Sequence, residues 1–280
     1  MKINTKWKIY GGEELDLSNY LVVGVLNITP DSFYDGGKFF DPSIALQHAK
    51  EMLEDGADVI DIGGESTRPF SKRIDAQEEL RRIMPVLEKL VSDVKEIIVS
   101  VDTYKAKVAE QAILKGAKII NDVSACRFDP ELIDVIGQYK PGYVLMHSLG
   151  RPEDMQKDPK YKDVVGELLD FFEKNLKKLT DANLPEDHIV IDPGIGFGKL
   201  LKHNLEILKN IDKFYKLGRP VFMGLSNKFM WENLLGLPPD KREMATQVAT
   251  GLLASKGVLI HRVHNVKLTR DTLKIVRSIC

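Results

Sequence analysis

Short apolar runs rich in valine and isoleucine recur along the chain, and each is followed by a polar or glycine-rich cluster. The runs lack strict alternation of apolar and polar positions, so they predict strands that are buried on both faces. The predicted strands are residues 21–26, 58–62, 97–101, 118–121, 142–147, 188–191, 220–224 and 259–263. Because the carboxyl ends of parallel strands face the same way, we expect the polar clusters to converge at one end of the sheet.

Helical periodicity fills the segments between the predicted strands. In residues 75–91, for example, the apolar side chains fall on one stripe of a helix. Asp41 followed by Pro42 is a typical helix start, and a glycine after each of four helices predicts a C-cap. These glycines are Gly56, Gly116, Gly218 and Gly257. The predicted helices are residues 42–55, 75–91, 104–115, 129–138, 162–181, 203–216, 241–256 and 269–278.

Eight strand-then-helix units in one chain predict an α/β fold of the closed (β/α)8 or TIM-barrel class. The alternative is an open, doubly wound sheet that binds its ligand where the strand order reverses. No G-x-G-x-x-G motif follows the first predicted strand, which favours the barrel. We expect residues 1–20 to form a short strand pair or cap on the barrel floor, and residues 21–280 to form the barrel, as a single domain.

Composition and charge narrow the classes of partner. With 40 Lys and Arg against 41 Asp and Glu, the formal charge is −1, which argues against nucleic acid or an anionic membrane as the main partner. No apolar run reaches the roughly 20 residues of a membrane helix, and the start of the chain lacks a signal-peptide pattern. Cys126 and Cys280 make neither a disulfide framework nor a metal motif, so we predict a cytoplasmic protein.

Three polar residues at predicted strand ends are candidates for binding a heterocycle. Asp102 and Asn121 end neighbouring strands, and Asp192 lies on the opposite side of the predicted ring. A carboxylate accepts two N–H bonds and a carboxamide both donates and accepts, which suits the donor and acceptor edge of a heterocycle. The alternative is that the two aspartates only cap the helices that follow them.

A second group of residues is suited to an anion. Ser66, Thr67 and Arg68 open the long loop over residues 63–74, and Arg262 and His264 follow the last predicted strand. Hydroxyls, backbone N–H groups and guanidinium forks bind phosphate, and barrels often bind phosphate near their last strands. For Arg68 alone, the alternative is an ordinary surface ion pair.

Two further positions have one functional and one structural interpretation. The carboxamide oxygen of Asn27 could be a ligand for Mg²⁺, or it could stabilise its own turn before Pro30. Lys228 could lie against a planar ligand or bind a carboxylate, or it could be a solvated lysine at a helix start. The glycine-rich run from Asp192 to Lys199 lacks the spacing of a P-loop. We interpret His147, Trp7 and Trp231 as packing residues.

Together these runs closely resemble the dihydropteroate synthase family. Each run alone is moderately specific, but all eight occur in the family's order, from about Lys8 to the C-terminus. The resembling runs are Leu26–Gly37, Asp61–Pro69, Ser100–Thr103, Ile120–Val123, Met146–His147, Asp192–Lys199, Ser226–Lys228 and Arg262–His264.

The resemblance implies a TIM barrel of folate biosynthesis that joins 7,8-dihydropterin-6-ylmethyl diphosphate to 4-aminobenzoate and releases diphosphate, with Mg²⁺ as cofactor. It implies a homodimer and a sulfonamide target as well. The pterin would be held by the candidate catalytic residues Asp102, Asn121, Asp192 and Lys228. Diphosphate and metal would be held by Asn27, Arg68, Arg262 and His264. The aminobenzoate site would be shaped by Phe33, Thr67, Pro69, Ser226 and Lys228.

The chain departs from the family pattern at two positions. Asn227 stands where the family usually has an arginine, and Phe70 stands where a small residue is usual. A pterin-binding methyltransferase barrel is a rival interpretation, but it would leave residues 27–37 and 66–68 without a diphosphate to bind. Another rival, motivated by Asn227, is a pterin-binding protein that has lost catalysis. A third alternative is a phosphate-binding aldolase barrel. Such an enzyme needs a Schiff-base lysine inside a strand, and no predicted strand contains a lysine placed for that role.

Overall fold

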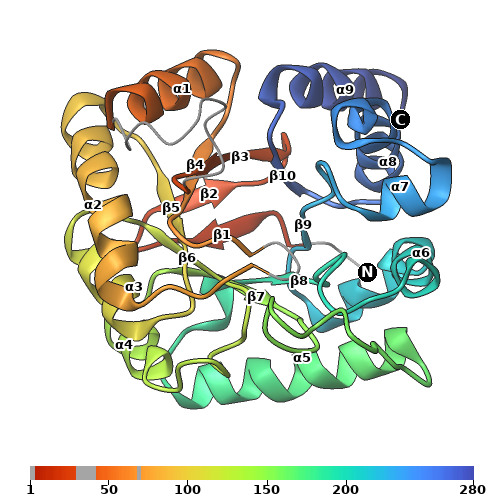
Figure 1. The fold of residues 1–280 in the computed structure, drawn as a ribbon, viewed down its shortest axis with the longest axis horizontal. Helices are drawn as coiled ribbons and strands as arrows, with labels where there is room; N and C mark the ends of the chain where they lie inside the picture. Colours follow the sequence, from red (N-terminus) through yellow and green to blue (C-terminus); the bar gives the residue numbers. More distant parts are fainter. Residues whose placement is uncertain (1–3, 30–41, 68–70) are drawn as a thin grey trace.

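The fold is a closed barrel of parallel strands surrounded by helices (Figure 1). It is seen in a computed structural model that describes residues 4–29, 42–67 and 71–280. The barrel strands are β3 (Leu21–Asn27), β4 (Val59–Gly63), β5 (Val99–Asp102), β6 (Ile119–Asp122), β7 (Gly142–Met146), β8 (Ile189–Asp192), β9 (Phe222–Met223) and β10 (Ile260–Val263). All eight predicted strands are confirmed, with ends that differ by up to two residues.

The strand order distinguishes a barrel from an open sheet. Neighbouring strands pair in parallel in the order β8-β7-β6-β5-β4-β3-β10-β9. A parallel bridge between Ile191 and Val221 then joins β8 to the segment before β9, and Ile191 N donates to Pro220 O at 3.0 Å. The ring is therefore closed, and the alternative of an open doubly wound sheet is wrong.

An antiparallel strand pair, β1 (Lys6–Lys8) and β2 (Glu14–Asp16), lies at the amino-terminal ends of the barrel strands. Trp7 is buried and its indole Nε1 donates to His188 O at 2.8 Å, just before β8. Trp7, Ile9 and Leu17 pack with inward apolar side chains of the barrel strands. The expected pair therefore covers the apolar floor, which leaves the opposite end as the polar one.

Eight predicted helices are present, and their apolar stripes pack on the outside of the barrel to form the main core. The helices are α1 (Pro42–Glu54), α2 (Ala76–Asp93), α3 (Ala106–Leu114), α4 (Leu132–Tyr139), α5 (Val164–Asp181), α6 (Leu201–Lys209), α7 (Met230–Leu235), α8 (Glu243–Ser255) and α9 (Val266–Ile279). Short 3-10 turns are η1 (Glu186–His188), η2 (Ile211–Leu217) and η3 (Pro239–Lys241). Figure 1 shows α8 and α9 side by side on one flank of the ring.

Two details differ from the sequence prediction. The helix expected over residues 203–216 is two pieces, α6 and η2, because the chain turns at Asn210. The six-residue α7 was missed because it is too short to show helical periodicity. The four predicted C-cap glycines all have positive φ, between 68° and 106°, as that position requires.

Candidate active site

A buried cluster of two carboxylates, one carboxamide and one guanidinium lies at the carboxyl ends of the barrel strands. We call Asp61, Asp102, Asn121 and Arg262 the inner cluster. Arg262, from β10, donates from Nε to Asp61 Oδ2 at 2.6 Å and from Nη2 to Asp102 Oδ2 at 2.9 Å. Asn121 Nδ2 also donates to Asp61 Oδ2, at 3.2 Å. Four strands thus bring their polar side chains to one point, as the sequence predicted for Asp102, Asn121 and Arg262.

The inner cluster keeps acceptor capacity that its own members do not use. Asp61 Oδ1 and Asn121 Oδ1 are buried, and neither has a hydrogen-bond partner among the residues that the structure describes. Burial raises the pKa of Asp102 to about 7, although Arg262 opposes this shift. A buried oxygen without a partner is costly, so such atoms are typical of a site that a ligand with N–H donors completes.

The opposite wall of the site is built from the loop after β8. Asp192 is buried, and its Oδ1 accepts the Gly194 N–H at 2.7 Å. Lys199 turns back into this loop, where its Nζ contacts His147 Nδ1 at 2.9 Å and donates to Gly194 O at 3.0 Å. Burial lowers the pKa of Lys199 to about 7 and raises that of Asp192. The lysine therefore fixes the loop that carries Asp192.

A third wall contains the turn after β9. Lys228 Nζ lies 4.4 Å from the centre of the Phe197 ring, a cation–π contact across the site. Burial lowers the pKa of Lys228 to about 8, with Asp192 opposing the shift. Ser226 Oγ lies 2.9 Å from His264 Nδ1 and accepts the His264 backbone N–H at 3.3 Å. Lys228 thus faces the site and is not a solvated helix-start lysine.

The end of β3 contributes Asn27 on the remaining side. A Cβ built on Gly63 would lie 3.4 Å from Asn27 Oδ1 and 3.7 Å from the Asp102 Cβ, so the missing side chain keeps the space beside both residues open. The carboxamide oxygen is a hard ligand of the kind that Mg²⁺ prefers, with substrate oxygens and water completing the shell. Among residues 4–29, 42–67 and 71–280, no group of three or more His, Cys, Asp or Glu gathers as a metal cluster.

The capping interpretation of the two aspartates is wrong. Helix α3 begins at Ala106, whose N–H is bound by the Asp129 side chain at 2.7 Å, while Asp102 binds Arg262. Helix α6 begins at Leu201, far beyond Asp192. Neither carboxylate therefore caps the helix that follows it, and both point to the site.

The structure does not describe every predicted site residue. Thr67 lies four residues beyond β4 and is half-buried. Phe33, Arg68 and Pro69, together with Phe70, lie outside the described residues. His147, Trp7 and Trp231 are buried and hydrogen-bonded inside the protein, which confirms their interpretation as packing residues.

Neither Asp61 nor Lys199 was singled out as a candidate from the sequence, although each lies at one end of a run that resembles the family. A feature of the sequence could have identified each of them. Asp61 is a carboxylate inside an otherwise apolar strand, and such a group is almost never fully buried without a paired charge. Lys199 closes a glycine-rich run, where its long side chain could fold back on the carbonyl groups.

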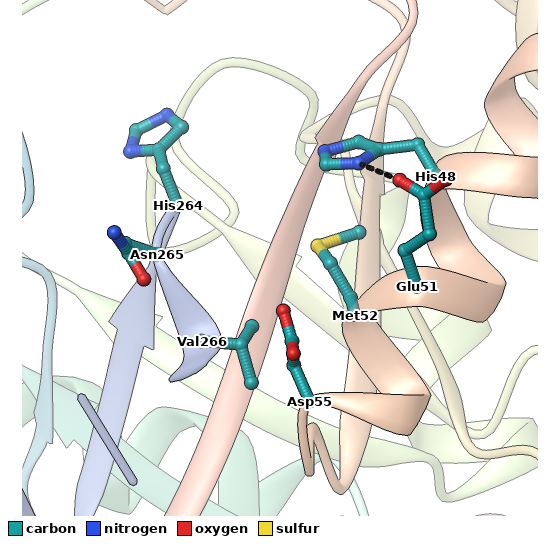
Figure 2. A pocket seen from close by; sticks show the side chains of 7 residues that line it. All are labelled: His48, Glu51, Met52, Asp55, His264, Asn265 and Val266. Atoms are coloured by element: carbon teal, nitrogen blue, oxygen red, sulfur yellow. Dashed lines mark ion pairs between the residues drawn. The ribbon is translucent and has the colours of Figure 1, made fainter. Parts of the chain in front are cut away.

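A separate pocket of about 300 Å³ lies on the flank of the barrel, between α1 and the start of α9. Figure 2 shows the His48 ring turned toward Glu51, and the Nδ1–Oε2 distance is 3.7 Å. Met52 and Val266, which also line the pocket, are buried. The pocket is lined by His48, Glu51, Met52, Asp55, His264, Asn265 and Val266. Of the predicted site residues, it shares His264 with the strand-end site.

Comparison with known proteins decides the family. The model of pterin-binding enzymes matches residues 23–264. The dihydropteroate synthase of Bacillus subtilis is 42% identical over 247 residues, which are 88% of this chain and 84% of that protein. The chain belongs to the dihydropteroate synthase family. Its activity is that of a dihydropteroate synthase, a transferase of folate biosynthesis.

Solved dihydropteroate synthases share the fold over nearly the whole chain. The Yersinia pestis enzyme, in complex with a sulfonamide drug, superposes with a TM-score of 0.91 at 38% identity, covering 96% of this chain and 97% of that one. The Xanthomonas albilineans enzyme with 4-aminobenzoic acid gives 0.91 at 37% identity, covering 98% of both. The dihydropteroate synthase family thus replaces the methyltransferase and aldolase interpretations.

Proposed function

We propose that the inner cluster, Asp192 and Lys228 together bind the pterin ring of 7,8-dihydropterin-6-ylmethyl diphosphate. The observation that carries this proposal is the pair of buried, unpartnered oxygens, Asp61 Oδ1 and Asn121 Oδ1, close to two buried aspartates. A pterin edge presents N–H donors and a ring acceptor, which matches carboxylates and a carboxamide. Lys228 would lie beside the ring or donate to its acceptor atoms.

The diphosphate would lie beside the pterin, toward Asn27, His264 and the predicted Arg68. Arg262 uses Nε and Nη2 for the inner cluster, and because a guanidinium carries five N–H donors it can contact an anion as well. When bound, Mg²⁺ supplies positive charge to the diphosphate oxygens, and Asn27 would hold it through its carboxamide oxygen. These groups stabilise the negative charge that develops on the leaving diphosphate.

The 4-aminobenzoate would enter last, into the space bordered by Thr67, Ser226 and Lys228, with Phe33 and Pro69 as the further predicted neighbours. Its amine nitrogen attacks the methylene carbon, the bond from that carbon to the diphosphate oxygen breaks, and the amine loses one proton. The protein's task is to hold the two substrates in line and to bind the leaving charge. No protein nucleophile is required.

The test of the proposed function is a diphosphate-release assay with both substrates, with and without Mg²⁺. We expect turnover that needs both substrates and the metal, and dihydropteroate as the product. Asp192→Asn should lose pterin affinity in calorimetry, because an amide N–H would then face a ligand donor. Binding of both substrates without diphosphate release would instead identify a pterin-binding protein that has lost catalysis.

We also propose a homodimer through the outer face of α8 and α9. The exposed apolar side chains on this face are Met244, Val248, Leu252, Leu268, Ile275 and Ile279. An apolar face of this kind on adjacent helices is typical of a subunit interface. Sedimentation should give a dimer, and Val248→Glu should give a monomer. A wild-type monomer at all concentrations would exclude this assembly.

The cytoplasmic location remains a prediction from cysteine usage, and both cysteines are free thiols. The part of the chain that the structure describes contains no helix with the length and apolarity that a membrane crossing needs.

A further inference from the structure

A second buried ion cluster lies beside the inner one, and the proposed mechanism does not use it. We call Glu65, Glu79 and Lys105 the outer cluster. Lys105 Nζ donates to Glu65 Oε2 at 2.6 Å and forms a second, short ion pair with Glu79. All three side chains are less than 10% exposed. Burying three charges is costly, so their placement calls for a physical reason.

Glu65 binds both ends of the loop between β4 and α2. Glu65 itself stands two residues after β4, and its Oε2 accepts the backbone N–H of Ile74 at 3.1 Å, just before α2. Its Oε1 accepts the Tyr104 hydroxyl at 2.9 Å. Both oxygens of this carboxylate are therefore occupied, by donors from the loop itself and from the segment after β5.

Further contacts hold the start of the loop against α2. Arg82 Nη1 donates to Gly64 O at 3.0 Å. A Cβ at Gly64 would lie 2.7 Å from the Ile83 Cγ2, so the backbone is packed directly on the helix there. Ser71 Oγ donates to Ser66 O at 2.5 Å across the loop. Thr67 thus follows a stretch of backbone that is anchored on several sides.

The same carboxylate links this loop to the residues that end β5. Tyr104 and Lys105, its two side-chain partners, come two and three positions after Asp102. Asp61 and Asp102 are bridged by Arg262 in the inner cluster, and Glu65 bridges the same two strand ends farther along the chain. The β4–β5 ladder pairs Gly63 with Asp102, and beyond that pair Glu65 is the side chain that joins the loop before Thr67 to the segment after β5.

We propose that Glu65 is a positioning residue, which holds the β4–α2 loop in register with the end of β5 so that Thr67 meets 4-aminobenzoate. This inference rests on the proposed function, which assigns Thr67 to the aminobenzoate site. Glu65 itself does not touch the substrate. Lys105 forms the buried ion pair with Glu65, and Glu79 is the second ion-pair partner of Lys105.

Glu65→Gln tests the proposal because its amide N–H would face the Lys105 and Ile74 donors while the size of the side chain is kept. We expect the KM for 4-aminobenzoate to rise about ten-fold, while the affinity for the pterin substrate changes by less than about two-fold. We also expect faster hydrogen exchange at the Ile74 amide, which Glu65 protects in the wild type.

Two matched variants separate positioning from a general loss of structure. Glu79→Gln leaves the Glu65 bonds to Tyr104, Lys105 and Ile74 intact, so its KM and Ile74 exchange should match the wild type. Glu88 lies on the same helix as Glu79, and Glu88→Gln removes its exposed ion pair, at 2.7 Å, with Lys115 at the end of α3; this variant should also change nothing. Should Glu65→Gln not fold, Tyr104→Phe removes one Glu65 bond and should shift KM in the same direction, by a few-fold.

The proposal is overturned if Glu65→Gln leaves the Ile74 exchange at the wild-type rate. It is also overturned if Glu79→Gln raises the KM as much, or if pterin affinity falls by the same factor as aminobenzoate affinity. If the wild type releases no diphosphate, the proposed function fails on its own. The Ile74 exchange then still decides whether Glu65 holds the loop.

Discussion

The inner and outer clusters are built alike, since each places two carboxylates around one cation beside the ends of β4 and β5, with Arg262 coming from β10 and Glu79 from α2. They differ in how many of their buried oxygens lack a hydrogen-bond partner and in how exposed their cation is. The inner cluster keeps two buried oxygens without partners on Asp61 and Asn121, and its cation is 20% exposed. In the outer cluster, Glu65 accepts three hydrogen bonds and the cation is 8% exposed.

This difference indicates that the inner cluster binds a ligand and that the outer cluster supports the fold. Open acceptors beside a partly accessible guanidinium are suited to a ligand that completes the hydrogen bonds. In the outer cluster, burial raises the pKa of Glu79, whose Oε1 has no hydrogen-bond partner within the described part of the chain. The two glutamates outweigh burial at Lys105 and raise its pKa. The hydrogen bonds to Glu65 and the ion pairs of Lys105 all join protein groups to one another, which suits a cluster that supports the fold.

The largest expected effect is on stability. Lys105→Met should lower the free energy of unfolding by about 3–5 kcal/mol, because it leaves buried carboxylates without their cation. Arg262→Met should cost less, about 1–3 kcal/mol, because the Arg262 side chain is 20% exposed against 8% for Lys105, so water can reach the inner carboxylates more easily. Urea unfolding of both variants measures the difference. Equal losses would contradict the division between a supporting and a binding cluster.

Asp102→Asn should act on binding more than on folding. We expect the affinity for the pterin substrate to fall by roughly 10–100-fold, which corresponds to 1–3 kcal/mol for a donor placed where an acceptor is needed. Calorimetry with the pterin substrate measures this loss. Glu79→Gln, in the outer cluster, is the control and should bind the pterin substrate normally.

The raised pKa of Asp102 should appear in the pH dependence of stability. Its ordinary value is 3.8, so between about pH 4 and pH 7 the folded state holds a proton that the unfolded state lacks. The contribution of Asp102 to the free energy of unfolding therefore falls as the pH rises through this window. Pterin affinity should change the opposite way, because the ionised carboxylate is the better acceptor. Unfolding curves at several pH values, compared with Asp102→Asn, isolate this group; parallel curves would count against the assignment.

The smallest effect is expected outside both clusters, at Asn227. Arg242 Nη1 donates to Asn227 O at 3.2 Å, so a cation already lies beside the position where the family usually has arginine. Asn227 has φ 56°, a left-handed conformation that asparagine adopts more readily than arginine. Asn227→Arg should therefore leave both KM values unchanged or slightly higher, within about 1 kcal/mol. A salt-sensitive gain in affinity would show that Arg242 does not compensate for the missing arginine.

Most of the fold could be predicted because each element left a local signal. The strands from Leu21 to Val263 are apolar runs, and the glycines after helices mark where strands begin again. The shortest features could not be predicted. Helix α7 has six residues, too few to show helical periodicity, and the break at Asn210 leaves no local pattern. At the site, strand-end positions were enough to single out Asp102, Asn121, Asp192 and Arg262.

The sequence by itself determined which strand ends are polar, and the closed barrel then brings those ends together. Only the tertiary structure decided which charge pairs with which. Arg262 lies 201 residues from Asp61 and 160 from Asp102, and nothing local in the chain indicates that one guanidinium binds both carboxylates. Glu65 and Lys105, 40 residues apart, meet for the same reason. Burial sets the pKa values and the unpaired oxygens, and burial depends on packing between elements that are distant in the sequence.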